Sequence, residues 1–145
     1  MSIPGNLKEA LGKLAPRAWL RPFRLVGGTA LALQYDHRLS EDLDFFTNRP
    51  FDTREVITGL QGSGDFELNR HSEQTVIGSW NHAKVTFLLY QYPWIQASVP
   101  SRFPPVALAH PLEIGLMKLE ALSQRGARRD FVDLYFICQK LPVKD

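Results

Sequence analysis

Apolar residues in the first third of the chain recur at helical and strand-like spacings in turn. Residues 6–15 carry a leucine at every third or fourth position, which predicts a helix that Pro16 ends. Residues 23–26 form a short apolar run typical of a buried strand, and the alanine-rich residues 29–35 predict a short helix. Residues 42–46 place two carboxylates around an apolar residue and end in two phenylalanines, which indicates a strand with one polar face.

The middle of the chain predicts one more helix and then a group of strands. Asp52 is followed three residues later by Glu55, the pattern of an N-terminal capping box, and the Gly-Ser-Gly at residues 62–64 ends that helix. Runs rich in β-branched and aromatic residues follow at 66–71, 75–80 and 84–90. The polar breaks between them indicate antiparallel neighbours at an edge of the sheet.

The last third of the chain predicts a loop and two helices. Residues 93–105 contain four prolines and are expected to form a loop that crosses the molecule. Pro111 suits the first position of a helix that runs to about residue 124. Gly126 breaks the chain before a final helix over roughly residues 129–141. The side chains expected on the inner face of this helix are Phe131, Leu134, Tyr135 and Cys138.

The order of these elements indicates the fold class. From the first strand onward the order is β-α-β-α-β-β-β-α-α, which implies a mixed sheet with helices packed on it, an α/β or α+β domain. A chain of 145 residues is long enough for one well-packed core and too short for two. We therefore expect a single domain over residues 1–145, with an N-terminal helix (1–22), a sheet core (23–92) and a C-terminal helical part (106–145).

Composition changes this picture little. The chain is 44% hydrophobic and 22% charged, which is ordinary for a globular domain, and its net charge of +2 neither favours nor excludes nucleic acid. The single cysteine, Cys138, lies in an apolar run that indicates a core position, and it has no internal disulfide partner, which fits a reducing, cytoplasmic compartment. No run approaches the ~18 apolar residues of a membrane span, and the N-terminus lacks the apolar stretch of a signal peptide.

Two acidic residues, Asp42 and Asp44, carry the clearest chemical signal. Alternate residues of a strand point to the same side, so both carboxylates face one way while Leu43 faces the core. Adjacent carboxylates repel each other unless a cation lies between them, and hard oxygen ligands suit Mg²⁺ or the similar Mn²⁺. Taken alone, such a pair is more often a solvated surface feature; in this context it predicts a divalent-cation site.

The glycine pair Gly27-Gly28 stands between the first predicted strand and the helix that follows it. Glycines lack a Cβ, so a phosphate can approach the backbone N–H groups at the start of the helix, whose dipole favours negative charge. In isolation, the pair would be better explained as a turn. A phosphate-binding helix start beside a metal-binding acid pair is the minimum equipment for phosphoryl or nucleotidyl transfer.

Two longer segments resemble a known family. They are VGGTALALQYDHRLSEDLDFF and LMKLEALSQRGARRDFVDLYFI, in which the glycine pair, Arg-x-Ser and Asp-x-Asp occur in register. Over about residues 23–141 the chain resembles the AbiEii-type nucleotidyltransferase toxins of the polymerase-β-like superfamily, whose members generally continue well beyond this point. The resemblance implies that an acceptor hydroxyl on RNA (tRNA 3′ ends) or on a protein side chain attacks the α-phosphate of a nucleoside triphosphate and releases pyrophosphate. It also implies a cognate antitoxin as partner.

The resemblance assigns roles to individual residues. Asp42 and Asp44 would bind Mg²⁺, and Asp130 would complete the pocket. The residues implied to contact the nucleotide are Gly27, Gly28, Thr29, Arg38, Ser40 and Lys118. The residues implied to be catalytic are Asp42, Asp44, Lys118 and Asp130.

One position departs from the family pattern. The third carboxylate of the superfamily lies on the strand after the acid pair, and the matching position here is Thr86. A hydroxyl is a weak metal ligand and no useful base, so the second, nucleophile-activating cation would lack a ligand. Loss of such assistance typically costs ~10²–10⁴ in rate. Three explanations remain open: Asp130 takes the place of the third carboxylate, the enzyme uses one metal ion, or the protein is a nucleotide-binding relic without activity.

Several side chains have a structural alternative to their functional reading. Lys118 lies among apolar residues, where extension to the surface is the alternative to a phosphate contact. Asp130 would also suit a helix cap, and Asp133 lies four residues after Arg129, so an ion pair within the helix is expected there. The basic cluster (Arg125, Arg128, Arg129) is either a solvated face or a surface that meets triphosphate or RNA. His37 and His110 are expected to make local hydrogen bonds, and no metal site is expected from the four histidines.

Three functions compete at this point. The first is the Mg²⁺-dependent nucleotidyltransferase. The second, favoured by Thr86, is a non-catalytic nucleotide-binding regulatory module, which would bind nucleoside triphosphate without transferring it. The third is an interaction module with a vestigial pocket, which would not bind triphosphate.

Overall fold

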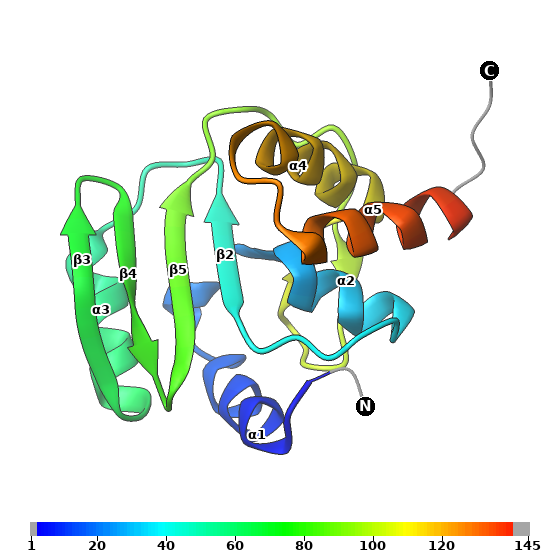
Figure 1. Ribbon diagram of the computed structural model, residues 1–145. Helices are drawn as coiled ribbons and strands as arrows, with labels where there is room; N and C mark the ends of the chain where they lie inside the picture. The colour runs from blue at the N-terminus through cyan, green and yellow to red at the C-terminus, as the bar shows by residue number, and fades with distance from the viewer. Residues whose placement is uncertain (1–2, 141–145) are drawn as a thin grey trace.

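The computed structural model describes residues 3–140 as a mixed sheet with helices on both faces (Figure 1). The strands are β1 Arg24–Val26, β2 Leu43–Thr47, β3 Phe66–Ser72, β4 Thr75–Trp80, β5 Ala83–Leu89, β6 Val99–Pro100 and β7 Ala107–Leu108. The helices are α1 Gly5–Leu14, α2 Gly27–Tyr35, α3 Thr53–Ser63, α4 Pro111–Gln124 and α5 Arg128–Lys140, and a short 3-10 turn covers Ala18–Leu20. The predicted mixed α/β class is confirmed.

The seven strands lie in the order β3-β4-β5-β2-β1-β7-β6. As predicted, β3, β4 and β5 are consecutive antiparallel neighbours at one edge. Strand β2 lies at the centre, antiparallel to β1 and parallel to β5. The proline-rich residues 93–105 are not entirely loop as expected, because they contain β6, which pairs with β7 at the opposite edge. An edge strand can include Pro100 because one side of its backbone needs no partner.

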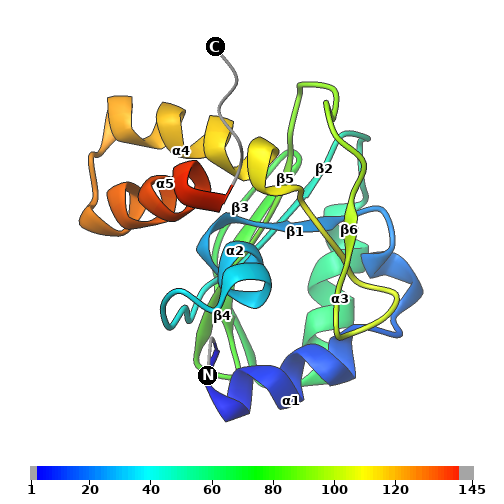
Figure 2. The same ribbon diagram turned by 90° about the vertical axis from the view of Figure 1, so that its right-hand side faces the viewer.

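The helices divide between the two faces of the sheet. Helix α3 packs on β3 and β4, whereas α4 and α5 pack against each other and against α2. Figure 2 shows α4 and α5 on the opposite side of the strands from α3. Asp44 of β2 lines a cleft to which α4 and α5 also contribute, so the acidic face of β2 is on the side of these two helices.

The core explains why β2 presents its acids in this direction. Leu43, Phe45 and Thr47 alternate as buried residues along β2. The ring of Phe45 stacks on Phe87 of β5 with centroids 4.9 Å apart, and Phe23 meets the edge of Phe87 at 5.2 Å. Because side chains alternate along a strand, burial of this apolar set turns Asp44 and the residues in phase with it to the other face.

The expected helix ends are confirmed, with one addition. The carboxylate of Asp52 accepts a hydrogen bond from the backbone N–H of Arg54 at 3.0 Å, and α3 ends at Ser63 with Gly64 as its C-cap. Helix α4 begins at Pro111. Its N-cap is His110, whose Nδ1 accepts from the N–H of Leu112 at 3.0 Å, which is the local hydrogen bond expected of this histidine.

The expected inner face of the last helix is wrong for Phe131, Tyr135 and Cys138, while Leu134 is half-buried. Phe131 and Tyr135 are 58% and 59% exposed, and Cys138 is exposed instead of lying in the core. The buried side chains of α5 are Asp130, Asp133 and Ile137. Ion pairs with α4 and with the segment after α2 fix this rotation, and apolar periodicity alone does not register them. Residue 141, the expected end of the helix, lies outside the described residues.

Within residues 3–140, no helix has both the length and the apolar content that crossing a bilayer requires.

Two glycines of α3 give a test of the packing against the 3-10 turn. A Cβ at Gly59 would lie 2.3 Å from ring atoms of Trp19, whereas a Cβ at Gly62 would have nothing within 4 Å. Alanine ordinarily stabilises a helix by ~0.5–1 kcal/mol relative to glycine, but overpacking costs ~1–3 kcal/mol. We expect Gly59→Ala to lower the free energy of unfolding in a urea titration and Gly62→Ala to maintain or raise it. Equal effects of the two substitutions would contradict this packing.

Candidate active site

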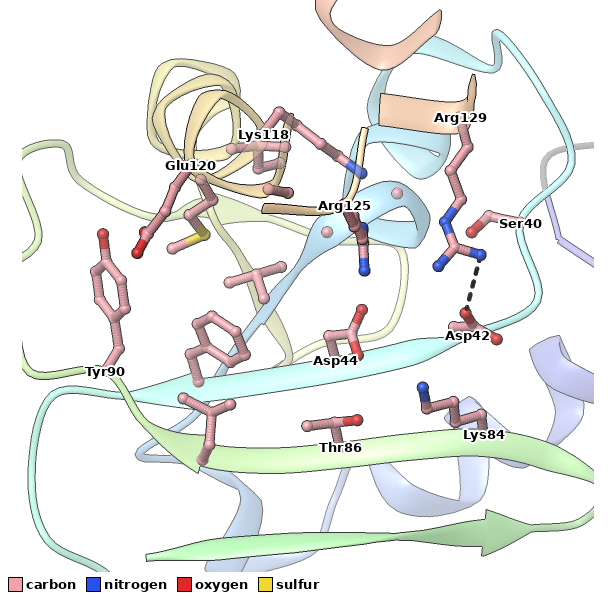
Figure 3. Close-up of a pocket in the computed structure, with 18 of the residues that line it drawn as sticks. Ser40, Asp42, Asp44, Lys84, Thr86, Tyr90, Lys118, Glu120, Arg125 and Arg129 are labelled. Carbon is pink, nitrogen blue, oxygen red and sulfur yellow. Dashed lines mark ion pairs between the residues drawn. The ribbon is translucent and has the colours of Figure 1, made fainter. Parts of the chain in front are cut away.

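The face of β2 and β5 that meets α4 and α5 is hollowed by a cleft of about 670 Å³ (Figure 3). Its walls come from the strands, the start of α2, helix α4 and the first turn of α5. Of the predicted site residues, Gly27, Gly28, Arg38, Ser40, Asp42, Asp44 and Lys118 line it. Thr29 and Asp130 are buried beside the cleft without contributing to its wall.

The two predicted metal-binding acids both face this cleft. Asp44 lies on β2, and Asp42 lies just before Leu43, where the strand begins. Burial and, next to it, the charge of Asp42 raise the pKa of Asp44, while Lys84, Lys118 and a hydrogen bond with Thr86 act in the opposite direction. A divalent cation between the carboxylates would remove this repulsion, so the pair fits Mg²⁺ or Mn²⁺ chemically.

The strand register shows which residue stands where the third acid of the superfamily would lie. Strand β5 runs parallel to β2, and Thr86 is the direct partner of Asp44. Its hydroxyl is hydrogen-bonded to the Asp44 carboxylate. Within residues 3–140, no group of three or more His, Cys, Asp or Glu side chains is arranged to hold a metal ion. A cation held by Asp42 and Asp44 would therefore complete its coordination with water and substrate oxygens.

The glycine pair has a steric role that the sequence does not reveal. Helix α2 begins at Gly27, whose φ of +72° suits glycine and whose Cβ would lie 2.8 Å from Oδ2 of Asp44. A Cβ at Gly28 would lie 2.0 Å from Nη2 of Arg38. The helix start also has no side-chain cap, so its first N–H groups are not satisfied in that way. Both glycines are thus needed for the acid and the arginine to lie against the helix start.

The hydroxyl groups of Thr29 and Ser40 bond to each other. Their oxygens are 2.7 Å apart, and Thr29 also donates to the backbone carbonyl of Asp42. Both residues are buried. These bonds fix the segment that leads into β2, so in the structure they position Asp42. The predicted contacts of Thr29 and Ser40 with the triphosphate stay predictions.

Asp133 is the centre of a buried ion cluster and does not form the expected ion pair with Arg129. It accepts from Nε and Nη2 of Arg38 at 2.7 and 2.9 Å, and Nε2 of His37 lies 2.7 Å from Oδ1. The ammonium of Lys118 lies 2.7 Å from Oδ2. Arg129 instead lies 4.0 Å from Asp42 at the cleft. The expectation of a local hydrogen bond for His37 is therefore wrong, because His37 bonds across the fold to Asp133 of α5.

Lys118 joins this cluster to a second carboxylate. It is only 6% exposed, so the alternative of extension to the surface is wrong. Its ammonium donates to Asp130 at 3.0 Å as well as to Asp133. Arg125 forms a bidentate pair with Asp130, and this hydrogen bonding, opposed by burial and aided by Lys118, lowers the pKa of Asp130 to about 2. Asp130 is therefore held away from Asp44 and does not stand where the third metal-binding acid is missing.

Lys84, which sequence reasoning did not single out, lines the cleft one alternation before Thr86 on β5. Continuing the strand alternation from Thr86 back to Lys84 would have placed it on the polar face. Arg125 and Arg129 of the expected basic cluster also line the cleft, and Arg128 does not. Five cationic side chains therefore line the cleft together with the two acids: Arg38, Lys84, Lys118, Arg125 and Arg129.

Comparison with solved structures defines the class of fold. A crystal structure of an H. pylori protein described as a nucleotidyltransferase superposes with a TM-score of 0.63 at 19% identity, covering 93% of this chain and 66% of that one. The Megavirus polyadenylate synthase superposes with a TM-score of 0.57 at 14% identity, covering 92% of this chain and 31% of that one. The chain has the nucleotidyltransferase fold.

The family follows from the sequence match. Residues 9–145 match the family described as nucleotidyl transferase AbiEii toxin, Type IV TA system, and the chain belongs to this family. It is also 33% identical over 135 residues to the uncharacterized protein aq_aa25 of Aquifex aeolicus (strain VF5). The match covers 92% of this chain and 66% of that protein, so the chain spans just under two thirds of the relative's length.

The ion cluster predicts an acid-sensitive fold. Burial alone would raise the pKa of Asp133, but hydrogen bonds from Arg38, Lys118 and His37 lower it overall. The pKa of Asp130 is also lowered, most strongly by its hydrogen bonds with Arg125. Because the unfolded chain protonates these acids first, near pH ~4, their stabilisation is complete above pH ~5 and is lost as the pH falls toward ~2. We expect the urea midpoint to fall across this window.

A substitution isolates the contribution of Asp133. Asp133→Asn should cost about 3–5 kcal/mol at pH 7, because it leaves buried cations unpaired, and should make the loss of stability in acid shallower. Glu9→Gln removes an exposed pair with Lys13 and should change neither quantity appreciably. An unchanged acid slope in Asp133→Asn would show that this cluster does not set the pH dependence.

Proposed function

We propose that this protein transfers a nucleotide from a nucleoside triphosphate to a hydroxyl of an RNA or protein acceptor, as the toxin of a toxin–antitoxin pair. The main support is one arrangement: Asp42 and Asp44 face the same cleft as the uncapped start of α2. Acids for a cation and N–H groups for phosphate oxygens then lie side by side. Family membership supports the toxin role and a cognate antitoxin.

The proposed reaction exchanges a phosphoanhydride bond of the triphosphate for a phosphoester bond to the acceptor. The acceptor oxygen attacks the α-phosphorus, the bond from the α-phosphorus to the bridging oxygen of the β-phosphate breaks, pyrophosphate leaves, and the hydroxyl proton passes to solvent. A divalent cation held by Asp42 and Asp44 would neutralise phosphate charge. Lys84, Arg125 and Arg129 line the same cleft and would stabilise the negative charge that develops on the triphosphate.

Lys84 lies on β5, the strand on which the third acid is missing. Lys84 is close enough to lower the pKa of Asp44, so it adds a fixed positive charge on the strand that would otherwise carry a further metal-binding carboxylate. We propose that the site uses one divalent cation together with this ammonium. Arg125 and Arg129, half-exposed at the rim, favour an acceptor that carries phosphate, which supports RNA.

A second candidate function is a module that binds nucleoside triphosphate without transferring it. Thr86 supports this candidate, because its hydroxyl is hydrogen-bonded to Asp44 and cannot act as a base. This module would bind Mg²⁺ and triphosphate in the same cleft and leave the substrate unchanged.

An acid-pair variant tests the proposal directly. The double substitution Asp42→Asn/Asp44→Asn should reduce transfer of α-³²P label to total RNA or protein in Mg²⁺ by about 10²–10³-fold or more, because charge stabilisation of the triphosphate is lost. Glu67→Gln, on the exposed edge strand β3, should transfer at the wild-type rate. Retained transfer in the double variant would refute the proposed site. If the wild-type protein binds nucleoside triphosphate but transfers no label, the result would favour the second candidate.

Restoring the third acid tests the one-cation arrangement. Thr86→Asp would place another carboxylate opposite Asp44, so repulsion should lower the Tm of the cation-free protein, and added Mg²⁺ should raise it more than in wild type. We expect the difference in Mg²⁺-induced shift to be at least about 3 °C. The control is Thr86→Asn, because asparagine has the size of aspartate but no charge. Equal shifts in both variants would contradict the placement of the metal beside Thr86.

A further inference from the structure

The cleft has a second end that the phosphate and metal chemistry does not use. Phe46, Tyr90 and Tyr92 line it there, together with Met117 of α4. Figure 3 shows Tyr90 and Glu120 on one side of Asp44, and Asp42 with Arg129 on the other. The cleft is therefore acidic and cationic at one end and aromatic at the other.

The aromatic end is a connected group of rings. Tyr90 lies 5.7 Å from Phe46 in a stacked arrangement, 5.4 Å from Tyr92 and 5.3 Å from Trp94, measured between ring centroids. Tyr92 is 62% exposed, so much of its side chain is open to solvent. An exposed face on a supported ring is what a stacking ligand needs.

The loop after β5, which carries Tyr90, Tyr92 and Trp94, is tied down from two sides. The buried carboxylate of Glu113 in α4 accepts from the N–H groups of Ile95 and Gln96, the latter at 2.8 Å. Arg24 of β1 donates to the carbonyl of Gln96 at 2.9 Å and lies 4.4 Å over the ring of Trp94. The rings are therefore held in place before any ligand binds, which limits the entropy cost of stacking on them.

A carboxylate that has no partner among residues 3–140 faces the same end. Glu120 of α4 lines the cleft, and within residues 3–140 its side chain makes no hydrogen bond or ion pair. Figure 3 shows its carboxylate at the same end as the Tyr90 hydroxyl. In keeping with this placement, burial and then the charges of Glu113 and Glu120 raise the pKa of Tyr90. Glu120 can therefore accept hydrogen bonds from the edge of a ring stacked beside Tyr90.

The spacing of the two ends suits one nucleotide. Phe46 follows Asp44 by two residues of β2, about 7 Å along the same face, and Tyr90 follows Thr86 by four residues. In a nucleoside triphosphate a single sugar separates the base from the α-phosphate. A triphosphate at the start of α2 and Asp44 would thus extend its base toward the rings.

We propose that Tyr90, Tyr92 and Phe46 form a nucleobase subsite, and that Glu120 favours bases with an exocyclic amino group over uracil. This inference rests on the proposed function, since it places the base of the same nucleotide. Amino groups of adenine, cytosine and guanine donate hydrogen bonds that a carboxylate accepts. Uracil presents its only ring N–H between two carbonyl oxygens, which repel a carboxylate.

Calorimetry with ATP, CTP, GTP, UTP and inorganic tripolyphosphate, each with Mg²⁺, tests the subsite. Tyr90→Leu and the exposed Tyr92→Ala should weaken nucleotide binding roughly 5- to 150-fold and leave tripolyphosphate binding unchanged. Tyr90→Phe, which retains the ring, should bind nucleotides like wild type. Wild type should bind UTP most weakly, and Glu120→Gln should reduce that discrimination.

The outcomes separate this inference from the proposed function. If both tyrosine variants bind nucleotides like wild type while Asp42→Asn/Asp44→Asn loses binding, the aromatic subsite is overturned and the phosphate site stands. Equal weakening toward nucleotides and tripolyphosphate also overturns the subsite. Equal affinity of wild type for UTP and the other nucleotides overturns the role of Glu120. If wild type binds neither nucleotides nor tripolyphosphate, the proposed function fails and the subsite with it.

Discussion

The buried ion cluster around Asp133 holds the site together. It joins three separate parts of the chain: the segment after α2 through Arg38 and His37, helix α4 through Lys118, and α5 itself. Removing charges from water is costly, so the cluster depends on the close pairing of Asp133 with Arg38 and Lys118 and on its hydrogen bond with His37. That pairing fixes how α5 is rotated, and with it the wall that α4 and α5 present to the cleft.

The charges on the two sides of that wall have different tasks. Asp130 and Asp133 pair with Lys118, Arg38 and Arg125, so these carboxylates are neutralised. Asp42 and Asp44 face the cleft beside Lys84 and Arg129, and burial followed by the charge of Asp42 raises the pKa of Asp44. The repulsion between these two acids thus lies where a divalent cation would bind, beside a helix start that suits phosphate. This division supports the proposal of nucleotidyl transfer more than either acid does alone.

The strands and helices around the site could largely be predicted from local pattern. Strand β2 was recognised because Leu43 and Phe45 alternate with Asp44, and burial of the apolar pair turns the acid outward wherever the strand lies. The cap at Asp52 and the start at Pro111 depend only on neighbouring residues. The last helix was placed correctly but its face was not, because the apolar side chains Phe131 and Tyr135 are exposed in favour of Asp130 and Asp133.

By itself, the sequence determined the order of elements and the face of β2 on which Asp44 lies, since each of these is set by residues close together in the chain. The match of Thr86 to the missing acid came from the resemblance to the family. Only the tertiary structure decided which partners the distant charges have. Lys118 meets Asp133, Arg38 meets Asp133 across 95 residues, and Lys84 and Tyr90 lie on the cleft. Contacts of this kind depend on how strands and helices pack in three dimensions, and no local spacing encodes them.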